Sequence, residues 1–368
     1  MIAYILLLAL VLSASLSLFY VSKTAKLAYK RELFDIPNKR KVHHERIPRL
    51  GGIAFVPSLA ISFLFSLAIV VKFDIVALPK PVLIDFCALT IGVIIMLFMG
   101  IYDDLLEVHY YYKFIVQLLA ALLLPLSGLW INNLYGLFGF HAISSFIGIP
   151  LTVLLIIFTV NAINLIDGID GLASGIAIVG FSVLGFLFFE KELWLYALLS
   201  FCAIGLLIPF FFFNVFGKVK DQKKIFMGDG GSLVLGYILV FMAIRYACVN
   251  PQFTSFSQGA LLLAFSSIML PILDVLQVIL IRLKNKKPLF SGDNTSHIHH
   301  RFMNMGLSPI ITLVVILLLS YLFALINFLL VCTININLLL LLNLLLWVLI
   351  NCVVSVLVKL VVKRKVKK

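Results

Sequence analysis

Charged residues are scarce in this sequence. They make up only 12% of its 368 residues, whereas 63% of the residues are hydrophobic. A soluble domain usually has about a quarter charged and about half apolar residues. The composition therefore excludes a soluble globular protein and a disordered chain, and it indicates a polytopic membrane protein.

Paired cysteines are missing as well. The five cysteines stand singly in apolar runs, and none forms a CxxC pair. This pattern excludes a secreted disulfide scaffold and favours small, buried apolar residues over metal ligands. The five are Cys87, Cys202, Cys248, Cys332 and Cys352.

Acidic residues are outnumbered by basic ones, 16 against 29, which gives a formal net charge of +13. A basic excess is typical of proteins that bind nucleic acid, an anionic membrane face or an acidic substrate. Because so little of the chain lies outside apolar segments, nucleic acid is the least favoured partner.

Long apolar segments fill the chain, and a membrane-crossing helix needs about 20 mostly apolar residues. The first segment has its basic residues after it, so we expect a retained anchor rather than a cleaved signal peptide. The expected fold is an all-α polytopic membrane protein with about 11 transmembrane helices in a single domain, residues 1–368. The segments are 1–22, 50–71, 82–101, 114–131, 146–163, 171–189, 193–213, 231–249, 258–281, 309–332 and 337–358.

Basic residues are distributed unevenly between the two sides of these segments. Of the 29 Lys and Arg residues, 25 follow odd-numbered segments and 4 follow even-numbered ones. Since cytoplasmic loops carry the excess of Lys and Arg, the N-terminus is expected outside and the C-terminus in the cytoplasm.

The acidic residues gather on the same cytoplasmic side. Asp274 is interpreted as the one acid within a span, and we expect it to face the bundle interior and anchor a polar network. Any chemistry should therefore lie on cytoplasmic loops. The eleven acids on this side are Glu32, Asp35, Glu45, Asp103, Asp104, Glu107, Asp167, Asp170, Asp221, Asp229 and Asp293.

Three short motifs on this side carry carboxylates. Asp103 and Asp104 end an apolar helix, where adjacent carboxylates repel unless a cation is near, although a solvated helix end stays an alternative. The segment NAINLIDGIDG repeats amides and carboxylates every three residues, on one side of a helix end. The segment FMGDGGS places Asp229 at a helix N-terminus suited to phosphate and Mg²⁺. No GK[ST] follows, so it is not a Walker A loop.

Two further loops supply basic groups. HIHHRF could form a zinc site, but no cysteine lies on this side, so we favour histidines that donate hydrogen bonds to phosphate. Nine basic residues lie between the first two segments. The part from Asp35 to Gly52 also has two prolines and a Gly-Gly pair, which favours an ordered loop that holds anions. These loops suit a soluble nucleotide diphosphate and a lipid monophosphate, with Mg²⁺ and basic donors offsetting the repulsion of two anions.

Taken in order, these motifs resemble those of the polyprenyl-phosphate N-acetylhexosamine-1-phosphate transferases, glycosyltransferase family 4, which are WecA-like and related to MraY. The resemblance covers nearly all eleven spans. The motifs are DIPNKRKVH, PRLGG, DDLLE, NAINLIDGIDGLA, FMGDGGS, PILDVLQVILIR and HIHHRF.

The resemblance implies transfer of a sugar 1-phosphate from a UDP-sugar to undecaprenyl phosphate, with release of UMP and with Mg²⁺, or else Mn²⁺, as cofactor. It implies that Asp103 and Asp104 form the acidic pair, one binding metal or acting as base, and that Asp229 is a metal ligand. The resemblance further implies that Lys41 and His43 contact the lipid phosphate or nucleotide, and that Asn164, Asp167 and Asp170 lie near the nucleotide or metal. It implies that Phe226 stacks on uracil. His299 and His300 are implied to contact the diphosphate, and His297 and Arg301, in the same motif, to bind substrate.

HIHHRF resembles the branch that uses UDP-N-acetylhexosamines, which favours UDP-GlcNAc and a surface glycan such as O-antigen or a teichoic-acid-like polymer. The expected location is the bacterial inner membrane, and a homodimer is left open. Glu107, Gly230 and the long segment from Val215 to Lys224 depart from the family pattern. A phospho-MurNAc-pentapeptide transferase, a transporter, and a receptor or scaffold stay alternatives.

Overall fold

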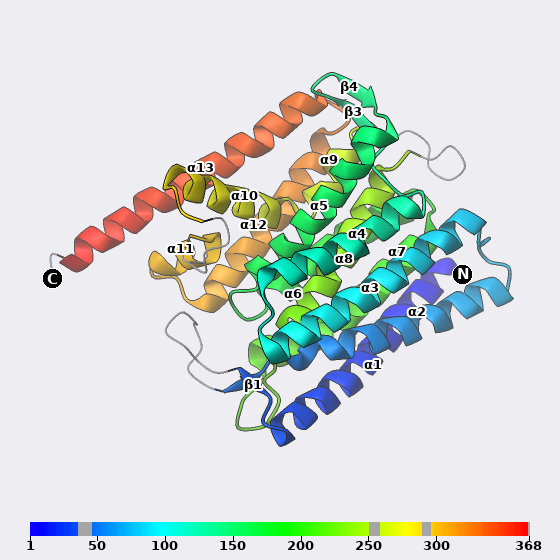
Figure 1. Ribbon diagram of the computed structural model, residues 1–368, viewed down its shortest axis with the longest axis horizontal. Helices are drawn as coiled ribbons and strands as arrows, with labels where there is room; N and C mark the ends of the chain where they lie inside the picture. Colours follow the sequence, from blue (N-terminus) through cyan, green and yellow to red (C-terminus); the bar gives the residue numbers. More distant parts are fainter. Residues whose placement is uncertain (36–45, 250–257, 289–295, 367–368) are drawn as a thin grey trace.

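The computed structural model describes residues 1–35, 46–249, 258–288 and 296–366, and helices dominate these residues (Figure 1). The helices are α1 (Ile2–Lys30), η1 (Leu50–Ala54), α2 (Phe55–Lys72), α3 (Lys80–Leu106), α4 (Tyr110–Leu126), α5 (Ser145–Ile166), α6 (Leu172–Glu190), α7 (Trp194–Phe216), α8 (Gly228–Ala247), α9 (Ala260–Ser266), α10 (Met269–Lys284), α11 (Ile298–Asn304), α12 (Pro309–Leu330) and α13 (Ile336–Val366).

Nine of the described helices are long and apolar enough to cross a membrane, or ten when the bent pair α9 and α10 counts as one span. The helix α4 is apolar but shorter, with 17 residues. Every predicted segment is largely helical, so the multi-pass membrane architecture is confirmed. The count of eleven and the outward N-terminus stay predictions.

The predicted span 258–281 is not one continuous helix. α9 and α10 meet at an angle of 85°. At the break, the Ser266 and Ser267 hydroxyls donate to the backbone carbonyls of Leu263 and Ala264, at 2.6 and 3.0 Å. Such bonds compete with helix continuation, and Pro271 suits the first turn of a new helix. Apolarity alone does not report these local backbone preferences.

The predicted span 114–131 is also displaced, because α4 begins at Tyr110 and ends at Leu126. The ring of His109 accepts a hydrogen bond from the backbone N–H of Tyr111 at 3.4 Å and so caps the helix start. At the other end, Gly128 has a φ of +93°, which a helix cannot continue through.

Asp274 is not the only acid within a span, contrary to the sequence interpretation. Asp85 lies in the second turn of α3 and is 4% exposed. The Tyr196 hydroxyl donates to its carboxylate at 2.9 Å, and Arg245 lies 3.7 Å from the same oxygen. Asp85 lies inside the predicted span 82–101, where the sequence interpretation overlooked it.

The helix α8 forms the centre of the molecule. All its residues from Gly230 to Ala247 are buried, and it packs against α3, α5, α6 and α9. A helix that is apolar on every side is stable only when neighbours surround it. The helix α8, which carries Asp229 at its N-terminus, is therefore held among its neighbours, while α1 and α13 lie at the periphery (Figure 1).

Two short antiparallel strand pairs lie at opposite ends of the helices. β1 (Phe34–Asp35) pairs with β2 (Ile47–Pro48) and closes the first loop at the end where α3 and α5 finish. β3 (Asn133–Leu137) pairs with β4 (Phe140–Ala142) at the end where α5 begins. Since α5 has 22 residues at about 1.5 Å rise each, the two ends lie about 33 Å apart.

Candidate functional site

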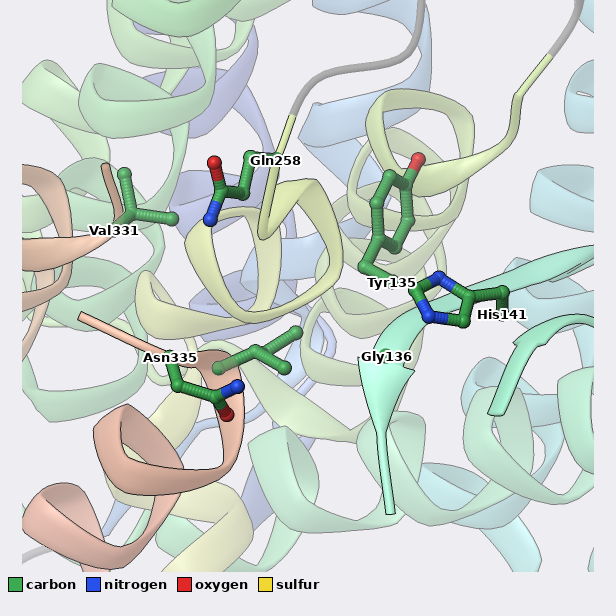
Figure 2. A pocket seen from close by; sticks show the side chains of 7 residues that line it. Tyr135, Gly136, His141, Gln258, Val331 and Asn335 are labelled. Carbon is green, nitrogen blue, oxygen red and sulfur yellow. The ribbon is translucent and has the colours of Figure 1, made fainter. Parts of the chain in front are cut away.

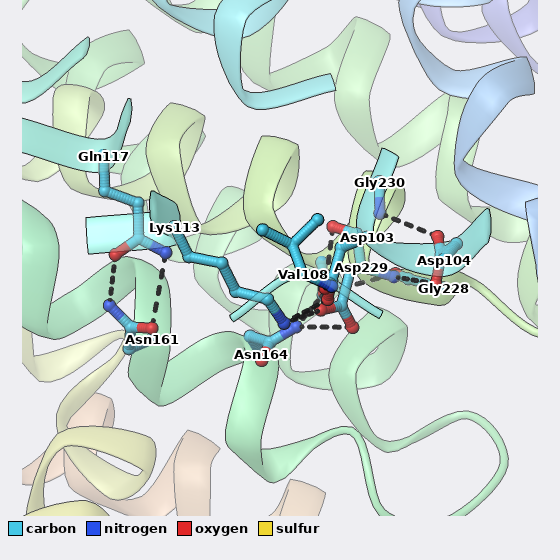
Figure 3. Close-up of polar contacts among 11 residues, drawn as sticks. Asp103, Asp104, Val108, Lys113, Gln117, Asn161, Asn164, Gly228, Asp229 and Gly230 are labelled. Atoms are coloured by element: carbon cyan, nitrogen blue, oxygen red, sulfur yellow. Dashed lines mark hydrogen bonds and ion pairs between the residues drawn. The ribbon is translucent and has the colours of Figure 1, made fainter. Parts of the chain in front are cut away.

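Asp104 joins the end of α3 to the start of α8. Its two carboxylate oxygens accept hydrogen bonds from the backbone N–H groups of Asp229 and Gly230, at 3.0 and 3.2 Å (Figure 3). The first N–H groups of a helix have no partner within the helix, and they carry a partial positive charge. Asp104 therefore caps α8 from a neighbouring helix, and both its oxygens are engaged.

Asp103, the other member of the pair, faces Lys113 at the start of α4. The Lys113 ammonium donates to Asp103 Oδ2 and lies 3.4 Å from Asp229 Oδ2 (Figure 3). The backbone N–H of Val108 donates to the other oxygen of Asp103 at 2.8 Å. A single cationic group thus lies between two carboxylates from helices far apart in the sequence.

Asn164 on α5 completes this cluster. Its side-chain amide donates to Asp229 Oδ1 at 3.1 Å and to the Ser232 hydroxyl at 2.9 Å. One turn earlier, Asn161 exchanges hydrogen bonds with Gln117 on α4, at 2.7 and 3.4 Å. The amides of the NAINLIDGIDG motif therefore fix α5 against α4 and α8. The predicted convergence of distant loops at one end is confirmed for these segments.

Glycine allows the close approach of these backbones. A Cβ at Gly100 on α3 would lie 2.3 Å from the Cα of Gly230. In η1, the N–H groups of Gly51 and Gly52 donate to the carbonyls of Phe226 and Met227 at 2.9 and 2.8 Å. The PRLGG and FMGDGGS motifs are therefore joined by backbone hydrogen bonds, and any larger residue at Gly100 would separate α3 from α8.

The turn after α5 brings two more carboxylates. Asp170 pairs with Lys224 at 2.5 Å, and the same ammonium donates to the Asn214 carbonyl at 2.5 Å. Asp167 has exposed surface, but many protein atoms surround its carboxyl group and reduce its contact with water. This desolvation, with the negative charges of Asp170 and Asp229, raises the pKa of Asp167 from 3.8 to about 7.

The predicted histidine motif forms the short helix α11. The carboxylate of Asp274 lies 2.7 Å from His297 Nδ1 and accepts from the Ile298 N–H at 2.9 Å. Asp274 is fully buried, so the expectation that it faces the interior and anchors a polar network is confirmed. The rings of His297 and His299 stack with centroids 5.9 Å apart.

His299 reaches the turn after α5. Its ring lies so close to Gly168 that a Cβ there would be 2.1 Å from His299 Nε2. The ring is buried, and neither nitrogen has a hydrogen-bond partner among the described residues. Burial, with the nearby His300 and His297, holds the pKa of His299 well below its usual value, so the ring is neutral at neutral pH. His300 is half-buried, and burial also lowers its pKa.

Arg301 and Phe226 have other contacts. The Arg301 guanidinium donates to Asn351 and Ser355 on α13. The Phe226 N–H donates to the Pro48 carbonyl at 2.8 Å. Their predicted substrate contacts stay predictions, as do those of Asn164, Asp167, Asp170 and the three histidines. Lys41 and His43 lie outside the described residues.

A divalent cation fits the donor chemistry of this cluster. Among the residues described here, no three His, Cys, Asp or Glu side chains form a preformed metal site. Mg²⁺, however, needs only one or two carboxylates, with water and substrate phosphates as its other ligands. Asp103 and Asp229 offer oxygen donors on either side of a position that already holds a cationic group, Lys113.

A separate pocket of about 280 Å³ lies at the other end of the helices (Figure 2). No aspartate or glutamate lines it, and none of the predicted site residues does, so it offers no carboxylate to a divalent cation. Its lining residues are Tyr135, Gly136, His141, Gln258, Val331, Asn335 and Ile336.

Sequence reasoning missed Lys113, Lys224 and Ser232 as parts of the site. Lys113 is the only basic residue between the third and fourth predicted spans, and that isolation beside an acidic pair was a usable signal. Lys224 stood among three other lysines, so nothing in the pattern distinguished it.

Comparison with known proteins gives a consistent result. Residues 86–247 match the family model described as glycosyl transferase family 4. The chain is 32% identical to the probable undecaprenyl-phosphate N-acetylglucosaminyl 1-phosphate transferase of Bacillus subtilis (strain 168), over 82% of this chain and 78% of that protein. It is 29% identical to the undecaprenyl-phosphate alpha-N-acetylglucosaminyl 1-phosphate transferase of Escherichia coli (strain K12), over 88% and 82%. The Yersinia pestis protein of the same name is 28% identical, over 85% and 80%.

Proposed function

Because this chain belongs to glycosyl transferase family 4, we propose that it transfers N-acetylglucosamine 1-phosphate from UDP-GlcNAc to undecaprenyl phosphate and releases UMP. An oxygen of the lipid phosphate bonds to the phosphorus that carries the sugar, and the bond from that phosphorus to UMP breaks. The observation that carries the proposal is the cluster of Asp103, Asp104, Lys113 and Asp229 at one end of the helices.

Asp103 and Asp229 would hold Mg²⁺, with Mn²⁺ as a substitute. When bound, the ion would neutralise phosphate charge and help to align the two substrates. Asp104 keeps the α8 N-terminus in place through its two backbone hydrogen bonds. The Lys113 ammonium lies between Asp103 and Asp229, and it can move from these carboxylates to bind a phosphate oxygen.

Two other groups near the cluster suit the reaction. The pKa of Asp167, about 7, is close to the second pKa of a phosphate monoester, about 6, so Asp167 can accept a proton from the lipid phosphate. The ring of His299, whose nitrogens have no hydrogen-bond partner within the described part of the chain, offers a neutral hydrogen-bond donor beside the Asp167–Asp170 turn.

The alternatives fit less well. A transporter places its ion and substrate ligands near the bilayer midplane, whereas this cluster lies at the ends of α3 and α5 and the start of α8. The relatives above are named as N-acetylglucosaminyl transferases, which favours UDP-GlcNAc over the phospho-MurNAc-pentapeptide donor. The bacterial inner membrane and a role in starting a surface glycan follow from the same proposal.

The direct test is UMP release by the purified protein with UDP-GlcNAc, undecaprenyl phosphate and Mg²⁺, together with mass spectrometry of the lipid product. A panel of UDP-sugars identifies the hexosamine. We expect EDTA to stop turnover and Mg²⁺ or Mn²⁺ to restore it. A correctly folded protein that turns over no UDP-hexosamine would refute the proposal.

A matched pair of variants ties the activity to the cluster. Asp103→Asn should abolish turnover while leaving membrane insertion intact. Asp221→Asn makes the same chemical change at an exposed position in the α7–α8 loop, and its rate should equal that of the wild type. Equal turnover rates in the two variants would show that Asp103 has no role in the reaction.

A further inference from the structure

The C-terminal helix α13 binds Arg301, the residue that follows His299 and His300 in the chain. We propose that Asn351 and Ser355 are positioning residues, which orient the histidine-bearing helix α11 by binding Arg301. This inference rests on the proposed function, in which His299 and His300 serve the reaction.

Arg301 makes three hydrogen bonds to α13. One terminal nitrogen donates to the Asn351 side-chain oxygen. The other donates to the Asn351 backbone carbonyl at 3.0 Å and to the Ser355 hydroxyl at 2.6 Å. The planar guanidinium fixes both direction and distance in such an arrangement. Because Asn351 and Ser355 are four residues apart, they lie on one face of α13.

The location of these polar residues is unusual for their helix. Of the candidate spans, α13 has the smallest buried share, 17% of its most apolar window. A polar side chain on such a helix is unfavourable in lipid unless another helix binds it. The polar face of α13 is directed at α11, so the helix is more than a lipid anchor.

The start of α11 is held by α10. Asp274 binds His297 and the N–H of Ile298, at 2.7 and 2.9 Å. A helix of seven residues is not stable by itself, so its orientation depends on such outside contacts. Asp274 fixes the first turn and α13 fixes Arg301, which leaves His299 against Gly168 between them.

Loss of either support should turn the histidines away from the Asp167–Asp170 turn. A misplacement of about 1 Å can reduce a rate about 10²-fold. Removing the α13 contacts should therefore lower kcat, while the affinity for UDP-GlcNAc changes little if Arg301 itself does not touch the donor.

The test uses the full-length protein in lipid nanodiscs, with Asn351→Leu and Ser355→Ala combined. Hydrogen exchange of amides in residues 298–304 should accelerate at least tenfold, and kcat should fall about 10- to 100-fold with KM for UDP-GlcNAc within threefold. Asn343→Leu is the matched control. Asn343 lies on α13, like Asn351, but pairs with the amide of Asn327 on α12, at 2.9 Å. It should affect neither exchange in α11 nor kcat.

Two more variants separate positioning from direct substrate binding. Asn351→Asp keeps an acceptor for Arg301 and should restore nearly the wild-type kcat. Arg301→Gln should lower kcat as much as the double variant, and combining them should cause little further loss. A raised KM for UDP-GlcNAc in Arg301→Gln, with normal kcat and normal exchange in Asn351→Leu/Ser355→Ala, would overturn the proposal and assign Arg301 to the donor.

The exchange measurement stands apart from the activity. If the wild type turned over no UDP-GlcNAc, the proposed function would fail, whereas faster exchange of α11 in the α13 variants would still support positioning. Unchanged exchange in those variants would overturn the positioning role whatever the activity.

Discussion

The Asp104 carboxylate accepts a hydrogen bond from the backbone N–H of Asp229 at 3.0 Å. One member of the acidic pair therefore fixes the backbone of the residue that supplies a third carboxylate. Its second oxygen accepts from Gly230 at 3.2 Å. Adjacent in sequence, Asp103 and Asp104 therefore have different surroundings. Asp104 binds the start of α8, and Asp103 is directed at Lys113. The two residues should respond differently to the same substitution.

Asp104→Asn should lower both turnover and thermal stability. An amide has one acceptor oxygen, so its NH₂ group would face a backbone N–H and one hydrogen bond would be lost. Hydrogen bonds to a charged group are worth about 1.5–3 kcal/mol each. Thermal unfolding in detergent should show a lower Tm for Asp104→Asn, whereas Asp103→Asn should lose turnover at nearly wild-type Tm. Equal Tm losses in both would contradict the division of roles.

Lys113→Gln should weaken turnover and strengthen metal binding. Removal of one preorganised electrostatic group typically costs about 10²–10³ in rate. In the free protein, however, Lys113 competes with a cation for Asp103 and Asp229, so its loss should increase Mn²⁺ affinity measured by electron paramagnetic resonance without substrate. Lys220→Gln, in an exposed loop, is the control. Weaker Mn²⁺ binding in Lys113→Gln would show that the lysine does not occupy the cation position.

Much of this arrangement could be predicted from sequence, since apolar run lengths, basic loops and polar clusters are local features. They indicated the membrane fold, the common end for Asp103, Asp229 and Asn164, and the inward position of Asp274. The break between α9 and α10 could not be inferred, because serine and proline are also common in continuous membrane helices. Asn351 was missed because its partner Arg301 lies 50 residues away, whereas Lys113 was missed although it follows Asp103 by only 10 residues.

Arg245→Leu should strongly destabilise the fold, a consequence of the buried pair that sequence reasoning overlooked. Arg245 and Asp85 are 3% and 4% exposed, and their charged groups lie 3.7 Å apart. Removing one partner of a buried ion pair costs about 3–5 kcal/mol, because the remaining charge stays buried. Unfolding in denaturing detergent should show this loss, and Asp85→Asn added to Arg245→Leu should recover part of it. A double variant no more stable than Arg245→Leu would argue against the pairing.

Turnover should rise as pH increases through about 7. The pKa of Asp167 is raised from 3.8 to about 7 by desolvation and by nearby Asp170 and Asp229, so the carboxyl is mostly protonated below that pH. As a proton acceptor, it works only in the ionised form, present above pH 7. The rise of kcat between pH 6 and 8.5 should be smaller in Asp167→Asn than in the wild type and unchanged in Asp221→Asn. A rise of the wild-type size in Asp167→Asn would assign the titration to another group.

Gly168→Ala should reduce turnover by displacing His299. An added Cβ would lie 2.1 Å from His299 Nε2, and the ring is only 1% exposed, so it has little room to move away. Shifts of about 1 Å at a reacting group can cost about 10²-fold. Gly230→Ala is the matched control, because it makes the same change next to Asp229 and its Cβ would meet nothing closer than 3.4 Å. Measured kcat should fall at least tenfold in the first variant and less than threefold in the second. If both variants kept their full rates, the contact between the Asp167–Asp170 turn and α11 would have no part in turnover.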